Sequence, residues 1–360
     1  MGKYSQFIAK ERRSVPTPEG LVDKNGRCVF GTFAEEFKTM DLVSAKKPTH
    51  APQFMNRLKL TLWEATEVNL KEGVLLAVVC DMGIFGLTLN TFYDKRTKKA
   101  YQWTTNLKSK DTVIAPSLLN HSRAEARTKM SFVKYDNDFG NGGCDLSGSH
   151  KSKDGKTIEY SFHLSRLSKP CVVSIPFGEN RPLYSQKDFF KADGQLTING
   201  EKLVSDGDTV AVVDDHRGFY PRHAHYDWVT TMGKTEIDGE QKFFAINLTR
   251  NQSIDQERYN ENLIWLEGKT SILPPVKFTR SPESADAAGK STWHVEDEHG
   301  MVNVDFHVYD MTAMITHAVV VKIDYYIAFG ELTGYVLDED GNKYVLDGML
   351  GMGEDKTMLL

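Results

Sequence analysis

Residues 213–229 bring together an unusual number of side chains that can carry a proton. The segment has the sequence Val-Asp-Asp-His-Arg-Gly-Phe-Tyr-Pro-Arg-His-Ala-His-Tyr-Asp-Trp-Val, with three histidines, three aspartates and two arginines. Histidine titrates near neutral pH, and a neighbouring carboxylate can orient its ring or exchange a proton with it. Neither core packing nor solubility requires this mixture. The segment therefore indicates a polar functional site.

Alternate residues of a strand share one face, and this periodicity divides the segment into two sets of side chains. If residues 222–231 form a strand, His223, His225 and Asp227 project together. Such a face could transfer protons, bind a small ligand, or hold a divalent metal, since imidazole and carboxylate are ligands of zinc and iron. It could also be a polar ladder that only fixes strand register. We favour proton transfer or ligand binding, with no metal and no other cofactor.

Two adjacent aspartates precede this face. Asp214 and Asp215 cannot both point into one site, because neighbours on a strand face opposite sides. We expect one of them to form a salt bridge with Arg217 or Arg222. Such a pair is more typical of architecture than of catalysis.

A second polar cluster lies downstream, where Asn247, Thr249 and Asn251 alternate and Asn260-Glu-Asn262 precedes an apolar run. Grouped amides either bind the oxygen atoms of a ligand or satisfy buried backbone groups. A buried Glu261 could act as a general acid, or it could neutralise a nearby arginine. The candidate catalytic residues are His223, His225, Asp227, Tyr220 and Glu261. The candidate ligand-binding residues are Arg222, Trp228, Asn247, Asn251, Asn262 and Trp265.

Turn dipeptides recur along the chain and predict antiparallel hairpins. They are Asn25-Gly26, Asp154-Gly155, Asp193-Gly194, Asn199-Gly200, Asp238-Gly239 and Gly341-Asn342. Apolar residues alternate with polar ones over 157–164 and 302–308, and residues 234–248 fit two strands joined at Asp238-Gly239. Short helices are expected only over 34–40 and 186–192. Alternating strand–helix units are missing, which argues against a doubly wound sheet.

The chain is too long for one eight-stranded barrel, so we predict an all-β fold with two antiparallel barrel or sandwich halves and few short helices. We place the boundary near residues 185–195. The N-terminal half then covers 1–187, and the C-terminal half, which carries the whole 213–229 segment, covers 188–360.

Composition narrows the classes of partner. The net charge of −5 and the lack of a basic stripe argue against nucleic acid. The longest apolar run, 74–80, is too short for a membrane span, and no signal-peptide pattern is present. Four cysteines without paired spacing indicate neither disulfides nor a zinc knuckle. We expect a soluble, cytoplasmic protein whose partner is a small molecule; the oligomeric state is left open.

Several of these segments resemble the family called domain of unknown function 2804. They are 214–228, 244–252, 260–265, 273–276, 181–187, 57–63 and 348–354. That family is similar, more remotely, to lipocalin-like two-barrel proteins such as carotenoid 1,2-hydratases, AttH-type proteins, tocopherol cyclase and certain fungal cyclases. The resemblance implies two lipocalin-like barrels and, by analogy, acid-promoted water addition or cyclisation on an apolar substrate. It assigns no catalytic residue.

Three functions follow as hypotheses. The first is a hydratase, isomerase or cyclase that acts on a small, mostly apolar molecule by acid–base chemistry. The second is a non-catalytic binder or carrier of a hydrophobic, lipid-like ligand. The third is a carbohydrate-active protein, suggested by the mixture of amide, carboxylate, guanidinium and aromatic groups.

Overall fold

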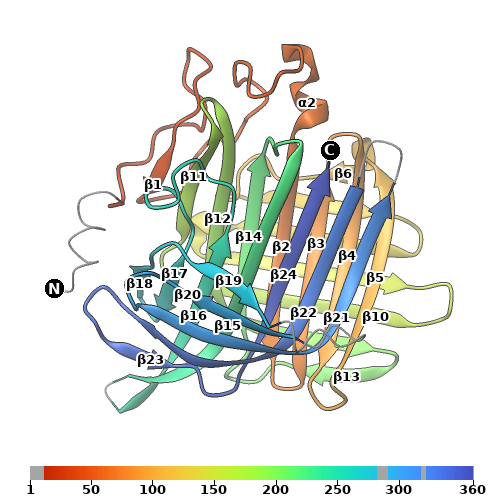
Figure 1. The fold of residues 1–360 in the computed structure, drawn as a ribbon. Coiled ribbons are helices and arrows are strands. Elements are labelled where there is room, and N and C mark those ends of the chain that lie inside the picture. Colours follow the sequence, from red (N-terminus) through yellow and green to blue (C-terminus); the bar gives the residue numbers. More distant parts are fainter. Residues whose placement is uncertain (1–11, 238, 282–290, 318–321, 360) are drawn as a thin grey trace. The chain divides into compact units, whose positions relative to one another are not determined.

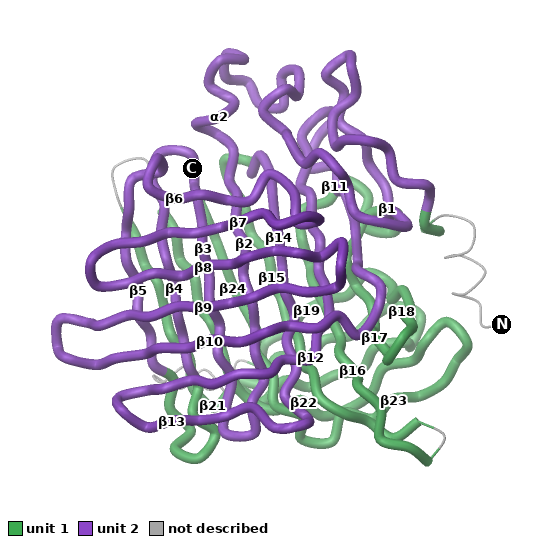
Figure 2. Tube along the Cα trace, turned by 180° about the vertical axis from the view of Figure 1, so that it is seen from behind, with its two compact units in different colours: residues 1–14, 93–100, 221–360 green, residues 15–92, 101–220 purple. Residues whose placement is uncertain are grey.

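The computed structural model describes residues 12–237, 239–281, 291–317 and 322–359. The chain folds into two compact units, coloured separately in Figure 2. Unit 1 comprises residues 1–14, 93–100 and 221–360, and unit 2 comprises residues 15–92 and 101–220. Within the described ranges, no helix is long and apolar enough to cross a membrane.

Antiparallel strands dominate both units (Figure 1), which confirms the all-β prediction. One sheet has the order β5-β4-β3-β2-β14-β12-β10-β9-β8-β7-β6, with β1, β11 and β13 off this path. Its strands are β1 (Gly31–Phe33), β2 (Thr61–Leu70), β3 (Gly73–Asp81), β4 (Phe85–Asp94), β5 (Lys99–Lys108), β6 (Thr112–Val113), β7 (Ser122–Arg127), β8 (Ser131–Asp138), β9 (Gly143–Lys151), β10 (Thr157–Arg166), β11 (Cys171–Gly178), β12 (Arg181–Ile198), β13 (Glu201–Val204) and β14 (Val210–Gly218). This sheet belongs to unit 2, except for the tip of the β4–β5 hairpin at residues 93–100.

The second sheet belongs to unit 1 and has the order β18-β17-β16-β15-β24-β22-β21-β20-β19, with β23 beside β22. Its strands are β15 (His223–Ile237), β16 (Glu240–Arg250), β17 (Leu263–Leu266), β18 (Lys269–Ile272), β19 (Lys277–Arg280), β20 (Thr292–Glu296), β21 (Val302–His317), β22 (Lys322–Leu337), β23 (Lys343–Val345) and β24 (Met349–Leu359). The helical segments are single turns: η1 (Gln53–Met55), α2 (Asn56–Lys59), η2 (Ser109–Asp111) and η3 (Phe139–Asn141).

Each sheet curls around its own hydrophobic core. In unit 2, β3 contacts β6, β7 and β8, which are distant from it in the strand order. The side chains enclosed there include Val68, Val133, Leu146 and Phe190, all fully buried. In unit 1, the enclosed cluster includes Phe244, Ile264, Val304 and Phe306. The predicted pair of barrel-like halves is therefore present as two curled antiparallel sheets.

The predicted alternation is confirmed in three strands. In β10, residues 158, 160, 162 and 164 are buried and the residues between them are exposed or half-buried. β21 buries positions 302, 304, 306 and 308 in the same way. β15 and β16 form the hairpin expected around residues 238–239, of which Asp238 lies outside the described residues. The turn at Asn199-Gly200 also forms, with both residues at positive φ.

Three local predictions are wrong. Asp193-Gly194 is not a hairpin turn but part of β12, where a Cβ on Gly194 would lie 2.0 Å from the Ser161 carbonyl oxygen of β10. The glycine is needed for this close strand approach rather than for a turn. Residues 186–192 also lie in β12, because they pair with β14. Residues 34–40 form no helix; Phe37 instead packs edge-on against Tyr184 in the core.

β12 runs without a break through the boundary expected at residues 187/188. The compact units instead change between Tyr220 and Pro221, after β14 has ended at Gly218. The 213–229 segment is therefore divided, with its first part in unit 2 and residues 221–229 in unit 1.

Candidate functional site

β15 places the predicted histidine–carboxylate face between two neighbouring strands. The strand begins at His223, as expected from the alternation over 222–231. β16 pairs on one side and sets Arg250 opposite Asp227. β24 pairs on the other side and sets Asp355 opposite Asp227 and Thr357 opposite His225. Directly opposed residues in an antiparallel pair have side chains within reach of one another.

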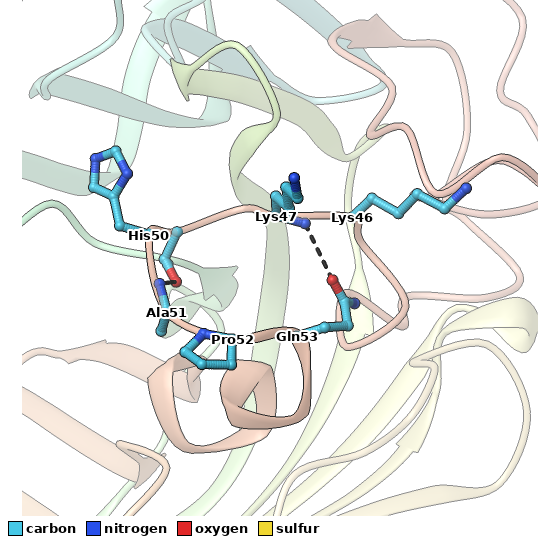
Figure 3. A pocket seen from close by; sticks show the side chains of 7 residues that line it. Lys46, Lys47, His50, Ala51, Pro52 and Gln53 are labelled. Carbon is cyan, nitrogen blue, oxygen red and sulfur yellow. Dashed lines mark hydrogen bonds between the residues drawn. The ribbon is translucent and has the colours of Figure 1, made fainter.

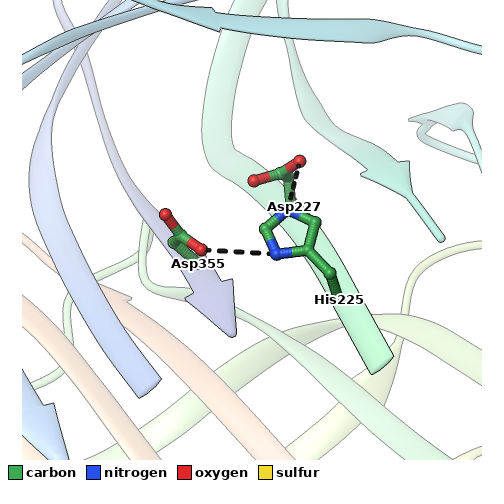
Figure 4. A group of neighbouring side chains, drawn as sticks. All are labelled: His225, Asp227 and Asp355. Atoms are coloured by element: carbon green, nitrogen blue, oxygen red, sulfur yellow. Dashed lines mark hydrogen bonds and ion pairs between the residues drawn. The ribbon is translucent and has the colours of Figure 1, made fainter. Parts of the chain in front are cut away.

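The His225 ring is held between two aspartates, as Figure 4 shows. Its Nε2 lies 3.2 Å from Asp227 Oδ2. Its Nδ1 lies 3.0 Å from the Thr357 hydroxyl and 3.8 Å from Asp355 Oδ1. The side chain of His225 is 33% exposed whereas that of Asp227 is fully buried, so the ring can exchange protons with solvent while its anchoring carboxylate cannot.

Two arginines complete this group. Arg250 Nε donates to Asp227 Oδ2 at 3.0 Å, and Arg280 Nη2 donates to Asp227 Oδ1 at 2.6 Å. Arg280 also lies 3.3 Å from Asp355 Oδ2. We call His225, Asp227, Arg250, Arg280 and Asp355 the unit 1 cluster. When both carboxylates are ionised, its two guanidinium groups balance their charge.

Curling of the sheet brings Arg280 to the cluster, since β19 lies at the far end of the strand order from β15. The guanidinium packs over the Trp293 ring, 4.3 Å from its centroid. Gly353 of β24 makes room for this ring: a Cβ there would lie 2.8 Å from Trp293 and from Phe306. Trp293 in turn meets Phe306 edge-on at 5.5 Å. Aromatic rings therefore border the charged groups.

The two aspartates have pKa values shifted in opposite directions. Burial raises the pKa of Asp227, but the hydrogen bond from His225 and the positive charge of Arg280 outweigh it, and the net pKa is lowered. Burial raises the pKa of Asp355; Arg280 opposes this, and the negative charge of Asp227 adds to it. Paired carboxylates whose pKa values diverge are typical of acid–base sites, where one stays ionised and the other carries the proton.

The donor atoms of His225, Asp227 and Asp355 lie within 4.8 Å of one another, which is close enough to hold a metal ion. The surroundings do not favour one. Both oxygens of Asp227 already accept hydrogen bonds from guanidinium groups, and two fixed positive charges beside the carboxylates would repel a divalent cation. The geometry fits an ion-pair and proton-transfer cluster better than a metal centre.

Several predicted residues lie away from this cluster. His223 and Arg222 are exposed at the start of β15. Tyr220 belongs to unit 2, where it stacks on Trp63 with ring centroids 5.9 Å apart. Trp265 is fully buried in β17. The predicted catalytic set therefore contributes only two residues, His225 and Asp227, to the unit 1 cluster.

Trp228 and Asn247 lie on the other face of β15 and β16, and with Asn251 and Asn262, which lie outside these strands, they form a hydrogen-bond network. Trp228 Nε1 donates to Asn247 Oδ1 at 2.7 Å, and Asn247 Nδ2 donates to the Glu261 carbonyl at 2.7 Å. Asn251 Nδ2 donates to Glu261 Oε1 at 3.4 Å. Asn262 accepts from the Thr249 amide at 2.6 Å and donates to a backbone carbonyl. This network ties the Glu261 loop to the sheet; a ligand-binding role for it stays a prediction.

Sequence reasoning missed Arg250, Arg280, Asp355 and Thr357. Arg250 could have been found, because the Asp238-Gly239 dipeptide predicts a two-residue hairpin turn, and the register that such a turn gives sets Arg250 opposite Asp227. The segment 348–354 ends one residue before Asp355, but nothing in its pattern indicates that β24 pairs with β15. Arg280 depends on closure of the whole sheet and leaves no local signal.

A surface pocket occurs elsewhere, in the loop that leads into η1 (Figure 3). It is lined by Lys46, Lys47, Thr49, His50, Ala51, Pro52 and Gln53. The Lys47 amide donates to Gln53 Oε1 at 3.1 Å, which shapes the loop. None of the predicted site residues lines this pocket.

Comparison with known families identifies the chain. A family model described as domain of unknown function DUF2804 matches residues 12–359. The chain belongs to this family. No curated protein matches this DUF2804 protein in sequence. The matched range spans both units, so each unit is part of the family's common architecture.

Two solved structures resemble this DUF2804 protein. Kievitone hydratase from Nectria haematococca has 14% sequence identity and a TM-score of 0.47, over 83% of this chain and 88% of that one. CghA with Sch210972 has 9% identity and a TM-score of 0.38, over 96% of this chain and 98% of that one. At these identities and TM-scores, neither likeness bears on the reaction or the substrate of this chain.

Proposed function

We propose that this DUF2804 protein is an acid–base enzyme of the hydratase or isomerase type. The observation that supports this most is the placement of His225 between two aspartates whose pKa values are shifted in opposite directions. A proton donor, a proton acceptor and a fixed anionic anchor are then available within one cluster. These are the groups that addition of water to a double bond, or its migration, requires.

Each residue has a distinct role in this proposal. Asp355, with its raised pKa, donates a proton to a substrate carbon. A water molecule adds to the cationic carbon and releases a proton to His225. Asp227 stays ionised and holds the resulting imidazolium in place. The nearest atoms, His225 Nδ1 and Asp355 Oδ1, are 3.8 Å apart, so a small side-chain shift brings them within hydrogen-bonding distance; His225 then returns the proton to Asp355, which restores the starting state with one water consumed.

The substrate is proposed to be small and mostly apolar. Trp293 packs against Arg280 of the cluster, and Phe306 packs edge-on against Trp293, so apolar aromatic surface lies beside the charged groups. The charged groups that the cluster offers are already paired with one another, so a strongly charged substrate would have to displace an existing ion pair. A neutral alkene or enone has no such requirement.

The test compares wild type with His225→Gln and His223→Gln. His223 is a matched control, because it lies on the same strand and the same face but is exposed outside the cluster. Each protein is incubated with a panel of neutral alkenes and enones, and products are followed by liquid chromatography and mass spectrometry. Hydration adds the mass of one water, and isomerisation changes the chromatographic retention time at constant mass. We expect His225→Gln to lower turnover by about 100-fold, the lower range for a proton-transfer group. His223→Gln should retain it.

Equal turnover by wild type and His225→Gln would contradict the proposal. A hydrophobic molecule that co-purifies with the protein and is released unchanged, with no panel member converted, would instead support the carrier hypothesis. Circular dichroism of each variant separates loss of chemistry from loss of fold.

A further inference from the structure

A second group of reactive side chains lies in unit 2, on one face of three neighbouring strands. β12 pairs with β14 so that Ser185 lies opposite His216 and Lys187 lies opposite Asp214. β14 pairs with β2 so that His216 lies opposite Trp63. Because these positions are separated by two along each strand, their side chains share a face. We call Ser185, Lys187, Asp214 and His216 the unit 2 cluster.

All four side chains meet within hydrogen-bonding range. Lys187 Nζ lies 3.0 Å from Ser185 Oγ, 2.9 Å from His216 Nε2 and 3.2 Å from Asp214 Oδ1. His216 Nε2 also lies 2.7 Å from Ser185 Oγ and 3.2 Å from Asp214 Oδ1. Lys187 is 2% exposed, an unusual degree of burial for a lysine. Its amine is therefore part of a compact proton-sharing group.

The geometry allows the amine of Lys187 and the imidazole of His216 to exchange a proton. His216 Nε2 has one lone pair in the ring plane, yet Lys187 and Ser185 both lie close enough to donate to it. If Lys187 and His216 were both positively charged at a separation of 2.9 Å, they would repel each other strongly. The single negative charge of Asp214 can offset only one of these two positive charges. A proton on Lys187 can therefore pass directly to His216, which leaves a neutral amine.

We propose that Lys187 forms a Schiff base with the carbonyl group of an aldehyde or ketone, at a second site that is independent of the unit 1 cluster. A buried lysine beside a proton acceptor is the arrangement that makes an amine nucleophilic near neutral pH. Ser185 and His216 supply the proton donor and the proton acceptor that are needed while the carbonyl oxygen is converted into a leaving water molecule.

The reaction balances with the groups present. The Lys187 ammonium passes one proton to His216, and the free amine attacks the carbonyl carbon. A second proton moves from the attacking nitrogen to the oxygen, which gives a carbinolamine. His216 returns its proton to the hydroxyl, the carbon–oxygen bond breaks, and water leaves. The product is a protonated imine on Lys187, so the net charge of the cluster is unchanged.

Aromatic rings beside the cluster indicate the class of carbonyl compound. The Trp63 ring lies 4.6 Å from the His216 ring and stacks on Tyr220 at 5.9 Å. Phe177 meets Tyr220 edge-on, also at 5.9 Å. Tyr220 and Phe177 are half-buried, so this row of rings leads away from the buried amine towards less buried residues. Flat, conjugated or aromatic carbonyl compounds fit such surroundings.

Reductive trapping tests the proposal on the full-length protein. Wild type is incubated with cinnamaldehyde and sodium cyanoborohydride, digested, and mapped by peptide mass spectrometry. Hydride reduces the imine carbon, so a trapped lysine gains the aldehyde less one oxygen atom. We expect Lys187 to be trapped before Lys191, which lies on the same face of the same strand and is half-buried. His216→Gln should slow trapping at Lys187 by about 100-fold.

Labelling of Lys191 and of exposed lysines, with Lys187 unmodified until the protein is denatured, would overturn the proposal. Equal trapping in His216→Gln and wild type would also overturn it. His225→Gln leaves the unit 2 cluster intact, so it should trap Lys187 as wild type does. This control distinguishes failure of the Schiff-base site from failure of the function proposed for the unit 1 cluster.

Discussion

The two clusters combine similar residues but distribute charge differently. In unit 1, a partly exposed histidine lies between two aspartates that are neutralised by two arginines. In unit 2, a buried lysine and a histidine lie against one aspartate and one hydroxyl. Guanidinium groups keep their protons, so the positive partners in the unit 1 ion pairs are fixed. An amine can lose its proton, so the unit 2 cluster is itself reactive.

This difference predicts that removal of the aspartate has opposite chemical consequences in the two clusters. In unit 1, Asp227 anchors the imidazole of His225 and the guanidinium groups of Arg250 and Arg280. In unit 2 the aspartate stabilises the charged form of the lysine and therefore restrains its amine. Loss of the carboxylate should thus disable the first cluster and activate the second.

The largest effect is expected from Asp227→Asn. The variant removes a fully buried charge that pairs with Arg250 and Arg280, and breaking a buried pair from one side costs about 3 kcal/mol. Urea unfolding measures the loss of unfolding free energy. Asp305→Asn is the control, because its partner His294 and Asp305 itself are both more than one-third exposed, and such a pair contributes less than about 1 kcal/mol. Equal losses in both variants would contradict the fixed-charge description of unit 1.

Asp214→Asn should make Lys187 more reactive rather than less. Loss of the carboxylate that stabilises the ammonium lowers the free-energy cost of forming the neutral amine, and a change of one pKa unit corresponds to about tenfold more free amine. The rate of cinnamaldehyde trapping at Lys187 measures the effect. A slower rate in Asp214→Asn, with the fold intact, would show that the aspartate assists the reaction instead of restraining the amine.

A third prediction concerns pH and the core of unit 2. Glu64 lies opposite Asp215, and burial together with the Asp215 charge raises the pKa of Glu64 to about 8. The folded state then holds a proton that the unfolded chain releases above its ordinary carboxyl pKa of about 4.3, so stability decreases from that pH up to about 8. Glu64→Gln mimics the protonated form and should flatten this decrease. The melting temperature at pH 5 and pH 9 measures it.

If Glu64→Gln and wild type lose the same number of degrees between pH 5 and pH 9, another group accounts for the pH dependence. Asp215 itself forms a salt bridge with Arg217, whose Nε lies 2.8 Å from Asp215 Oδ1. The same salt bridge confirms the expectation that one of the two adjacent aspartates pairs with a nearby arginine.

The smallest effect on the free energy of unfolding is expected from Trp228, which lies on the face of β15 that is hydrogen-bonded to Asn247. Trp228→Phe keeps the apolar ring but removes the donor to Asn247 Oδ1, and loss of one partner from a buried polar group costs about 1–2 kcal/mol. Urea unfolding again measures it. Turnover should be unchanged, because this face is separate from the unit 1 cluster. A large loss of turnover without loss of stability would support the ligand-binding role first expected for Trp228 and Asn247.

Much of the fold could be predicted from the sequence because strands and turns are encoded locally. Alternation predicted β10, β21 and the face of β15, and the Asp238-Gly239 dipeptide predicted the pairing of β15 with β16. The same local rule failed at Gly194, where the glycine permits close contact with β10 instead of a turn. A glycine has two structural uses, and the sequence does not distinguish them.

The two clusters were harder to predict because each depends on strands that are distant in sequence. β24 brings Asp355 beside β15 across more than a hundred residues, and curling of the sheet brings Arg280. Lys187 contacts Asp214 because β14 pairs with the first half of β12, whereas β13, which lies between them in sequence, pairs with the end of β12. In both cases the residues that were missed are set in place by long-range strand pairing rather than by local spacing.

Hydrogen exchange into substrate tests the proposed proton transfer at His225 most directly, since it detects proton transfer even without net product. Wild type, His223→Gln and His225→Gln are incubated in heavy water with the alkene and enone panel, and deuterium at carbon is followed by mass spectrometry. We predict that wild type and His223→Gln incorporate deuterium into the same compound, and that His225→Gln does so about 100-fold more slowly, because His225 no longer returns the proton to Asp355. Equal incorporation by His225→Gln and wild type would contradict the proposed role of His225.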